Sequence, residues 1–225
     1  MPEKNADLHG NVPDKSLVAL LLIDVINDLD FPEANELLKH ALPMAHQIAA
    51  LKKRAKRDGI PVVYVNDNFG RWRSDFKAQV DHCLQAGAIG KPIVELLRPD
   101  EDDYFVLKPK HSGFFSTTLD TLLEYLGVQA VILTGIAANI CVLFTANDAY
   151  MRDFHLLVPS DCVASNTEDE NRYGLEQMRK VLKADTRPST EISFEALKRI
   201  VGDGLQSEEK SQDWRSENVR RHETT

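Results

Sequence analysis

The sequence predicts an α/β protein with a three-layer, doubly wound, Rossmann-like sheet that is mostly parallel and carries helices on both faces. Short apolar runs alternate along the chain with helical patterns, as in repeated βαβ units. The first run, 18–23, has six consecutive apolar residues, too few for a membrane span and typical of a strand buried on both faces. Gly59 and Gly127 fall where a helix would give way to a strand, and glycine readily forms left-handed helix ends.

The expected strands are the short apolar runs at 18–23, 61–65, 104–107, 130–134 and 154–158. The helical patterns between and after them predict helices at 33–58, 75–83, 117–126, 139–151 and 168–183. We expect a break in the first helix near Pro43, because proline lacks an N–H group and clashes with the preceding turn. Residues 17–203 form one predicted domain, with a polar arm at 1–16 and a hydrophilic tail at 204–225.

The amino-acid composition limits the kinds of ligand that the chain is expected to bind. A chain of 225 residues is long enough to bury a substantial core without disulfides or structural metals. Its net charge of −8 and pI near 5.4 argue against nucleic acid or an anionic membrane, so a small molecule is the expected ligand. The three cysteines form no CxxC pair and the N-terminus has no apolar signal segment, which predicts a cytoplasmic protein.

Cys141 is the candidate nucleophile. It stands near the start of the predicted helix 139–151, shortly after a strand pattern that ends at Gly135. The first turn of a helix has unpaired N–H groups and the positive end of the helix dipole, and both favour thiolate over thiol. The plain alternative is a buried cysteine acting as a small hydrophobe, which is the expectation for Cys83 and Cys162.

Two further side chains follow apolar strands at equivalent ends. Asp24 follows the strand 18–23, and Lys108 follows the strand 104–107. Open α/β sheets bind ligands at the carboxyl ends of their strands. If the strands are adjacent and parallel, a base, a cation and the Cys141 thiol share one pocket. The alternatives are Asp24 as a cap or turn residue, and Lys110 as the functional lysine.

Three sequence blocks form a recognisable pattern: LLLIDVINDLDF near the start, LKPKHSGFFSTTLDTLL in the middle and LTGIAANICVLFTANDAYMRDFHLLVPSDCVAS after it. Over residues 17–201 the chain resembles the isochorismatase-like cysteine hydrolases, the superfamily that includes nicotinamidases and N-carbamoyl amide hydrolases. The resemblance implies a catalytic triad of Asp24, Lys108 and Cys141. The chain departs from many relatives at Ile26, where they have glutamine.

The resemblance also implies the groups that stabilise the oxyanion of a tetrahedral intermediate. These are the backbone N–H groups of Cys141 and Ala137, with a cis peptide bond between Ile136 and Ala137. It further implies a homo-oligomer, either a dimer or a tetramer. No cofactor is expected.

The sequence argues against metal and dinucleotide sites. Nicotinamidase relatives carry an Asp-x-His-x-His-like set after the second strand, whereas this chain has Asp67 without histidines in the run 64–73. We therefore expect no metal, which makes nicotinamide a less suitable substrate. The turn after the first strand lacks the glycines of a dinucleotide site, and its acidic residues would repel phosphate.

The segment after the second strand supplies the candidate substrate-binding residues Asn68, Arg71 and Trp72. Their amide, cationic and aromatic groups suit a polar or anionic planar molecule, although a charged surface loop is the alternative. Phe114 is expected to supply pocket wall and core packing. His111 suits a polar pocket group better than a general base, because Asp24 already fills that role.

Together these residues predict a metal-independent cysteine hydrolase that cleaves a C–N amide or carbamoyl bond of a small molecule through a thioacyl intermediate. Two alternatives stay open. One is an isochorismatase proper, which hydrolyses a vinyl ether and does not require a nucleophilic thiol. The other is a noncatalytic member that uses the pocket for binding or the fold as a platform for a partner.

Overall fold

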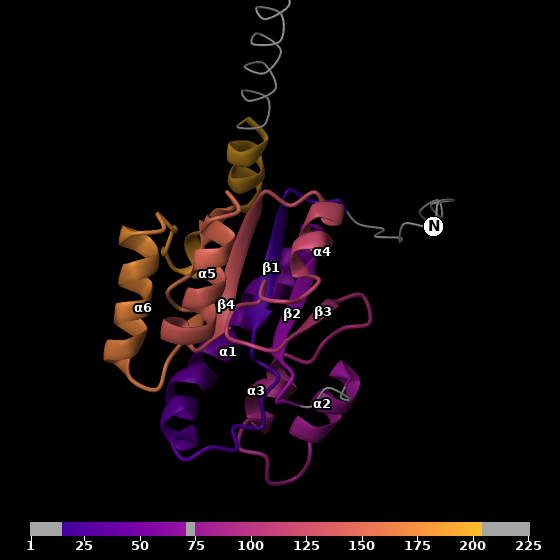
Figure 1. The fold of residues 1–225 in the computed structure, drawn as a ribbon, viewed down its shortest axis with the longest axis vertical. Coiled ribbons are helices and arrows are strands. Elements are labelled where there is room, and N and C mark those ends of the chain that lie inside the picture. Colours follow the sequence, from indigo (N-terminus) through magenta and orange to yellow (C-terminus); the bar gives the residue numbers. More distant parts are fainter. Residues whose placement is uncertain (1–14, 71–74, 204–225) are drawn as a thin grey trace, which may run out of the picture.

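A parallel sheet forms the centre of the molecule (Figure 1). In the computed structural model, which describes residues 15–70 and 75–203, this sheet has six strands in the order β3-β2-β1-β4-β5, with β6 paired to β4. The strands are β1 (Val18–Ile23), β2 (Val62–Asp67), β3 (Tyr104–Lys108), β4 (Ala130–Ile136), β5 (His155–Leu157) and β6 (Val163–Ala164). Every pairing between these strands is parallel, which confirms the predicted fold class.

Helices cover both faces of the sheet (Figure 1). One face packs against α1 (Ala34–Arg57), α2 (Phe76–Cys83), α3 (Lys91–Leu96) and the helical residues 194–203. The other face packs against α4 (Leu119–Leu126), α5 (Leu143–Tyr150) and α6 (Glu168–Lys180). Side chains of β1 alternate between the two layers because the side-chain period of a strand is two. Within the described residues, no helix combines the length and apolarity needed to cross a bilayer.

The first helix differs from the sequence expectation. The predicted break near Pro43 is wrong, because α1 continues through this residue. Ala41 and Ala45, on either side of the proline, are fully buried in the core. The free energy gained by burying this helix face compensates for the loss of the hydrogen bond that proline cannot donate.

Several elements were not predicted, and one predicted helix has a different structure at its start. The pattern did not reveal α3, β6 or the 3-10 turn η2 (Ser189–Glu191), since six, two and three residues carry too little periodicity. The helix over residues 194–203 was not predicted either. The expected helix 139–151 is a π-helix, η1 (Ala138–Val142), followed by α5.

A glycine sets the contact between the end of β4 and the central strand β1. Gly135 has φ +112°, and a Cβ atom built there would lie 2.0 Å from the carbonyl oxygen of Ile23. Any larger residue would push the two strand ends apart. Gly135 therefore holds the segment that leads to Cys141 close to the segment that leads to Asp24.

Gly135→Ala should lower the free energy of unfolding by about 3 kcal/mol or more, because it adds a backbone clash to an unfavourable φ. Gly59→Ala is the matched control, since Gly59 also has positive φ (+67°) but has no atom within 4 Å of the added Cβ. The control should cost only about 1 kcal/mol. Denaturant unfolding measures both values, and equal losses would contradict the close-contact argument.

Candidate active site

The site lies at the carboxyl ends of the strands, where the sheet order reverses between β1 and β4. Asp24 directly follows β1, Lys108 is the last residue of β3, and Cys141 lies in η1 after β4. Because β2 separates β1 from β3, the Lys108 side chain must reach past one strand to meet Asp24. Its Nζ atom lies 2.8 Å from Asp24 Oδ2 and 3.6 Å from Cys141 Sγ. The structure thus brings the three sequence-predicted residues together.

Asp24 is held in a turn that directs its carboxylate into the site. Its φ of +53° is uncommon for a residue other than glycine, although aspartate tolerates this region. The Asp24 N–H group donates to Val65 O at 3.0 Å, and Asp24 Oδ1 accepts a hydrogen bond from the Asp67 N–H group at 2.7 Å. One carboxylate oxygen is therefore fixed by the backbone, while the other faces Lys108.

Lys108 is fully buried, and its ammonium group has three close partners, with Asp67 Oδ2 farther away at 3.7 Å. Besides Asp24 and Cys141, it donates to the backbone carbonyl of Lys110 at 3.2 Å. An ammonium group has three N–H donors, so these contacts satisfy all of them. Lys110, the other candidate lysine, contributes its backbone carbonyl oxygen to the site as an acceptor for Lys108.

The π-helix η1 gives Cys141 its position. Its first wide turn is closed by a hydrogen bond from the Val142 N–H group to Ala137 O at 3.1 Å. Helix α6 packs closely on this turn, since a Cβ atom at Gly174 would lie 2.8 Å from Ala138 O. The peptide bond between Ile136 and Ala137 is cis. Single π-turns of this kind occur frequently at functional sites.

The electrostatics of the thiol differ from the sequence expectation. Burial, followed by the charge of Asp24, raises the pKa of Cys141 to about 12, and the opposing effect of Lys108 is smaller. The expectation of a thiolate at this helix start is therefore wrong for the resting site, although the charge of Lys108 does lower the thiol pKa. The sequence could not show that the thiol is half-buried or that Asp24 contacts it.

Asp24 and Lys108 stabilise each other's charged forms. Burial raises the pKa of Asp24, and Lys108 only partly offsets this effect. Burial alone would lower the pKa of Lys108, but the negative groups around it, led by Asp24, raise it instead. Lys108 therefore stays charged, and its charge helps Asp24 to remain a carboxylate in a buried place.

The candidate substrate-binding residues after β2 have different outcomes. Asn68 is buried, and its Oδ1 atom accepts a hydrogen bond from the Gly70 N–H group at 2.9 Å, so its side chain shapes the turn. Arg71 and Trp72 lie outside the described residues.

Phe114 and His111, which both follow Lys108 in the sequence, lie in different environments. Phe114 is buried in the core layer of α4 and α5, and the Arg152 guanidinium carbon lies 4.7 Å from its ring centroid. The structure thus gives Phe114 a packing role. His111 is exposed, and its Nδ1 atom lies 3.8 Å from Cys141 Sγ.

Asn66 is a positioning residue that sequence reasoning missed. Its Oδ1 accepts from the Ile26 N–H group at 3.2 Å, and its Nδ2 donates to Ile26 O at 2.6 Å. These two bonds clamp the loop that follows Asp24. The Ile26 side chain, which replaces the glutamine of many relatives, is fully buried in the core. The role of Asn66 depends on its contacts with a distant loop, and no local sequence pattern indicates them.

The described polar residues at the end of β2 and just after it bond to the protein itself. Asn66 and Asn68 use their side chains on the backbone, and Asp67 Oδ1 accepts from the Phe69 N–H group at 2.6 Å while Oδ2 lies 3.7 Å from Lys108 Nζ. In the described ranges, the one group of three potential ligands comprises Asp100, Asp102 and Asp103, which all contact the ammonium group of Lys56.

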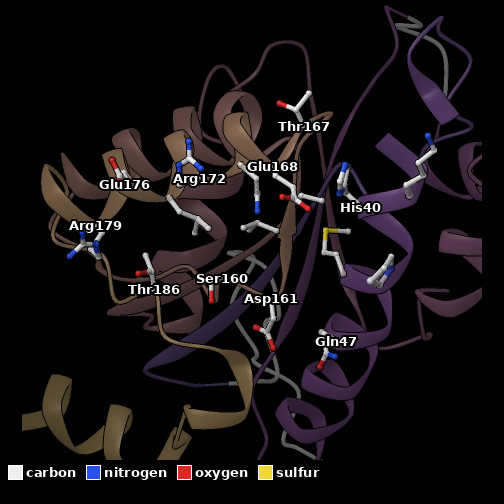
Figure 2. A pocket seen from close by; sticks show the side chains of 17 residues that line it. His40, Gln47, Ser160, Asp161, Thr167, Glu168, Arg172, Glu176, Arg179 and Thr186 are labelled. Atoms are coloured by element: carbon white, nitrogen blue, oxygen red, sulfur yellow. The ribbon is translucent and has the colours of Figure 1, made fainter. Parts of the chain in front are cut away.

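A separate hollow of about 530 Å³ lies between α1 and α6 (Figure 2). Its walls carry mixed charges, with His40 on α1 facing Glu168 and Arg172 on α6. None of the three residues Asp24, Lys108 and Cys141 lines it. This hollow is therefore not the place where the carboxylate, ammonium and thiol meet.

The fold and the contacts define a class: a parallel α/β protein with a carboxylate, an ammonium and a thiol at the switch point of its sheet. The family model of the Isochorismatase domain matches residues 18–186. The chain belongs to the isochorismatase family, as the sequence resemblance predicted.

Three relatives illustrate this membership. The chain is 42% identical over 174 residues to the uncharacterized isochorismatase family protein YaaI of Bacillus subtilis (strain 168), covering 77% of this chain and 95% of that protein. It is 32% identical over 173 residues to enterobactin synthase component B of Escherichia coli (strain K12), covering 71% of this chain but only 60% of that protein. The crystal structure of N-carbamoylsarcosine amidase from Thermoplasma acidophilum is similar, with a TM-score of 0.62, 28% identity, and coverage of 79% and 99%.

Cys141 should react first with iodoacetamide, because it is partly exposed whereas Cys83 and Cys162 are buried. Asp24→Asn should shift the pH dependence of the Cys141 alkylation rate to lower pH, since the charge of Asp24 raises the thiol pKa. Lys108→Met should shift it to higher pH. Mass spectrometry of partly labelled protein gives both the site and the rate. Preferential labelling of another cysteine, or shifts of equal sign in the two variants, would contradict this description.

Proposed function

We propose that the chain is a metal-independent cysteine hydrolase that cleaves a C–N amide or carbamoyl bond of a small molecule. The observation that carries this proposal is the contact of a buried carboxylate, a buried ammonium and a partly exposed thiol within one site. A nucleophile in reach of a base, with the base held by a third group, is the arrangement that covalent catalysis needs.

In the proposed first step, Asp24 removes the proton of the Cys141 thiol as Sγ attacks the substrate carbonyl carbon. The raised pKa of Cys141 makes a base necessary, because the thiol does not ionise by itself near neutral pH. The raised pKa of Asp24 makes its carboxylate a stronger proton acceptor than an ordinary aspartate. Backbone N–H groups of Ala137 and Cys141, at the start of η1, stabilise the resulting oxyanion.

In the second step, Asp24 returns this proton to the leaving nitrogen as the C–N bond breaks. An amine or ammonia leaves, and the group remains on Sγ as a thioester (acyl) or a thiocarbamate (carbamoyl). Water then hydrolyses this intermediate. Lys108 keeps its proton throughout, because its three donors hold Asp24, the Lys110 carbonyl and Sγ in place.

The comparisons support C–N chemistry without defining the substrate. One relative of known structure, at 28% identity, is an N-carbamoylsarcosine amidase. Side-chain oxygens of Asn66, Asp67 and Asn68 accept hydrogen bonds from backbone N–H groups, which supports a site that works without metal. Carbamoyl compounds, ureides and aromatic amides are therefore the first set to screen for ammonia release.

Cys141→Ala should abolish ammonia release, and Asp24→Asn should reduce it by roughly 100-fold or more, since general-base catalysis contributes that much. Neither change should greatly weaken binding of a product analogue, because both groups act on the reaction barrier. Cys83→Ala, the same substitution at a cysteine outside the site, is the control. Activity should also survive exhaustive dialysis against EDTA.

Three results would contradict the proposal. Ammonia release that persists in Cys141→Ala would contradict the covalent mechanism, and turnover of a vinyl ether by Cys141→Ala but not by Asp24→Asn would indicate an isochorismatase proper. Activity that disappears with EDTA and returns with zinc or iron would contradict the metal-independent site.

A further inference from the structure

His111 contacts the reactive sulfur from the open side of the site. Its Nδ1 atom lies 3.8 Å from Cys141 Sγ, and the imidazole is exposed to solvent. The ring also packs against Phe144, with 5.5 Å between ring centroids and an interplanar angle of 51°. Three side chains therefore interact with the thiol, namely Asp24, Lys108 and His111, and His111 is the solvent-exposed member.

The position of His111 is fixed by the loop that carries it. Thr145 Oγ1 accepts a hydrogen bond from the Gly113 N–H group at 3.0 Å and donates to Cys141 O at 2.7 Å. One α5 hydroxyl thus joins the His111 loop to the π-helix that carries the thiol. The Ser112 hydroxyl adds a second bond to the Asp148 carboxylate on α5.

Close packing adds a third constraint on this loop. A Cβ atom at Gly113 would lie 2.7 Å from the Val65 side chain, so the loop is pressed against β2. The contact between imidazole and sulfur is therefore a product of the local fold.

Each half of a thioacyl mechanism needs a base, one for the thiol proton and one for a proton of the attacking water. Acylation starts from a thiol proton, which buried Asp24 can reach. Hydrolysis of the thioester starts from a water molecule, which must arrive from solvent and needs a base beside the acyl carbon. Asp24 is only 5% exposed and Lys108 is fully buried, whereas His111 is exposed, so His111 is the contact of the sulfur that solvent water reaches directly.

We propose that His111 is the general base that activates water for hydrolysis of the thioacyl intermediate on Cys141. This inference rests on the proposed cysteine mechanism. Neutral His111 accepts a proton at Nδ1 as the water oxygen bonds to the acyl carbon. The C–S bond then breaks, and the leaving sulfur takes this proton back from His111, which restores the thiol and the neutral imidazole. The acid product leaves, so atoms and charges balance.

The test uses p-nitrophenyl acetate as a probe, since an activated ester can acylate a thiol without the natural substrate. The burst of nitrophenolate measures acylation, and the steady rate measures deacylation. His111→Gln keeps a hydrogen-bonding group, and His111→Phe keeps a ring against Phe144, but neither is a base. Both variants should keep the wild-type burst and lose roughly 100-fold of the steady rate. Intact-protein mass spectrometry should then find an acetyl group accumulating on Cys141.

Controls separate this inference from the proposed function. His46→Gln, at an exposed histidine on α1, should behave like the wild type. A wild-type steady rate in either His111 variant would overturn the base assignment, because it would mark a packing or hydrogen-bonding role. Loss of the burst in these variants would also overturn it by placing His111 in acylation. If Cys141→Ala retained the burst, the cysteine mechanism itself would fall. If the wild type showed no burst, a burst that appears in the His111 variants would still support the base assignment, and its absence there would overturn it.

Discussion

The buried ion pair between Lys108 and Asp24 is the interaction on which the rest of the site depends. Placing an ammonium and a carboxylate away from water is costly unless each finds charged and hydrogen-bonding partners. Here the carboxylate also accepts the Asp67 N–H group, and the ammonium also donates to a carbonyl and to the Cys141 sulfur. Neither charge would be stable without the other, and the thiol is held protonated beside them.

The parallel sheet makes this pair possible by bringing distant segments to one edge. Central strand β1 and its neighbour β4 meet at the switch point, where Gly135 permits a backbone approach that no side chain would allow. The lysine arrives from β3, and its length spans the intervening strand. Asn66 then clamps the loop after Asp24, so the carboxylate cannot turn away. The chemistry therefore depends on backbone geometry as much as on the three reactive side chains.

The sequence predicted five of the six strands and the meeting of Asp24, Lys108 and Cys141, because apolar runs ending in reactive groups are local patterns. It did not predict properties that arise from tertiary contacts. The thiol pKa depends on burial and on a carboxylate that is distant in the chain, and the clamp by Asn66 joins β2 to another loop. The continuity of α1 through proline likewise reflects packing on the sheet rather than local propensity.

The central claim is that Asp24 takes the proton of a thiol that does not ionise by itself, and the pH dependence of kcat/KM tests it most directly. We expect kcat/KM to fall on the acid side at a pH above the usual range of an aspartate carboxyl, because burial raises the pKa of Asp24. It should then stay level through neutral and mildly alkaline pH. A kcat/KM that instead keeps rising toward the thiol pKa of about 12 would contradict the account, since solvent rather than Asp24 would be generating the thiolate.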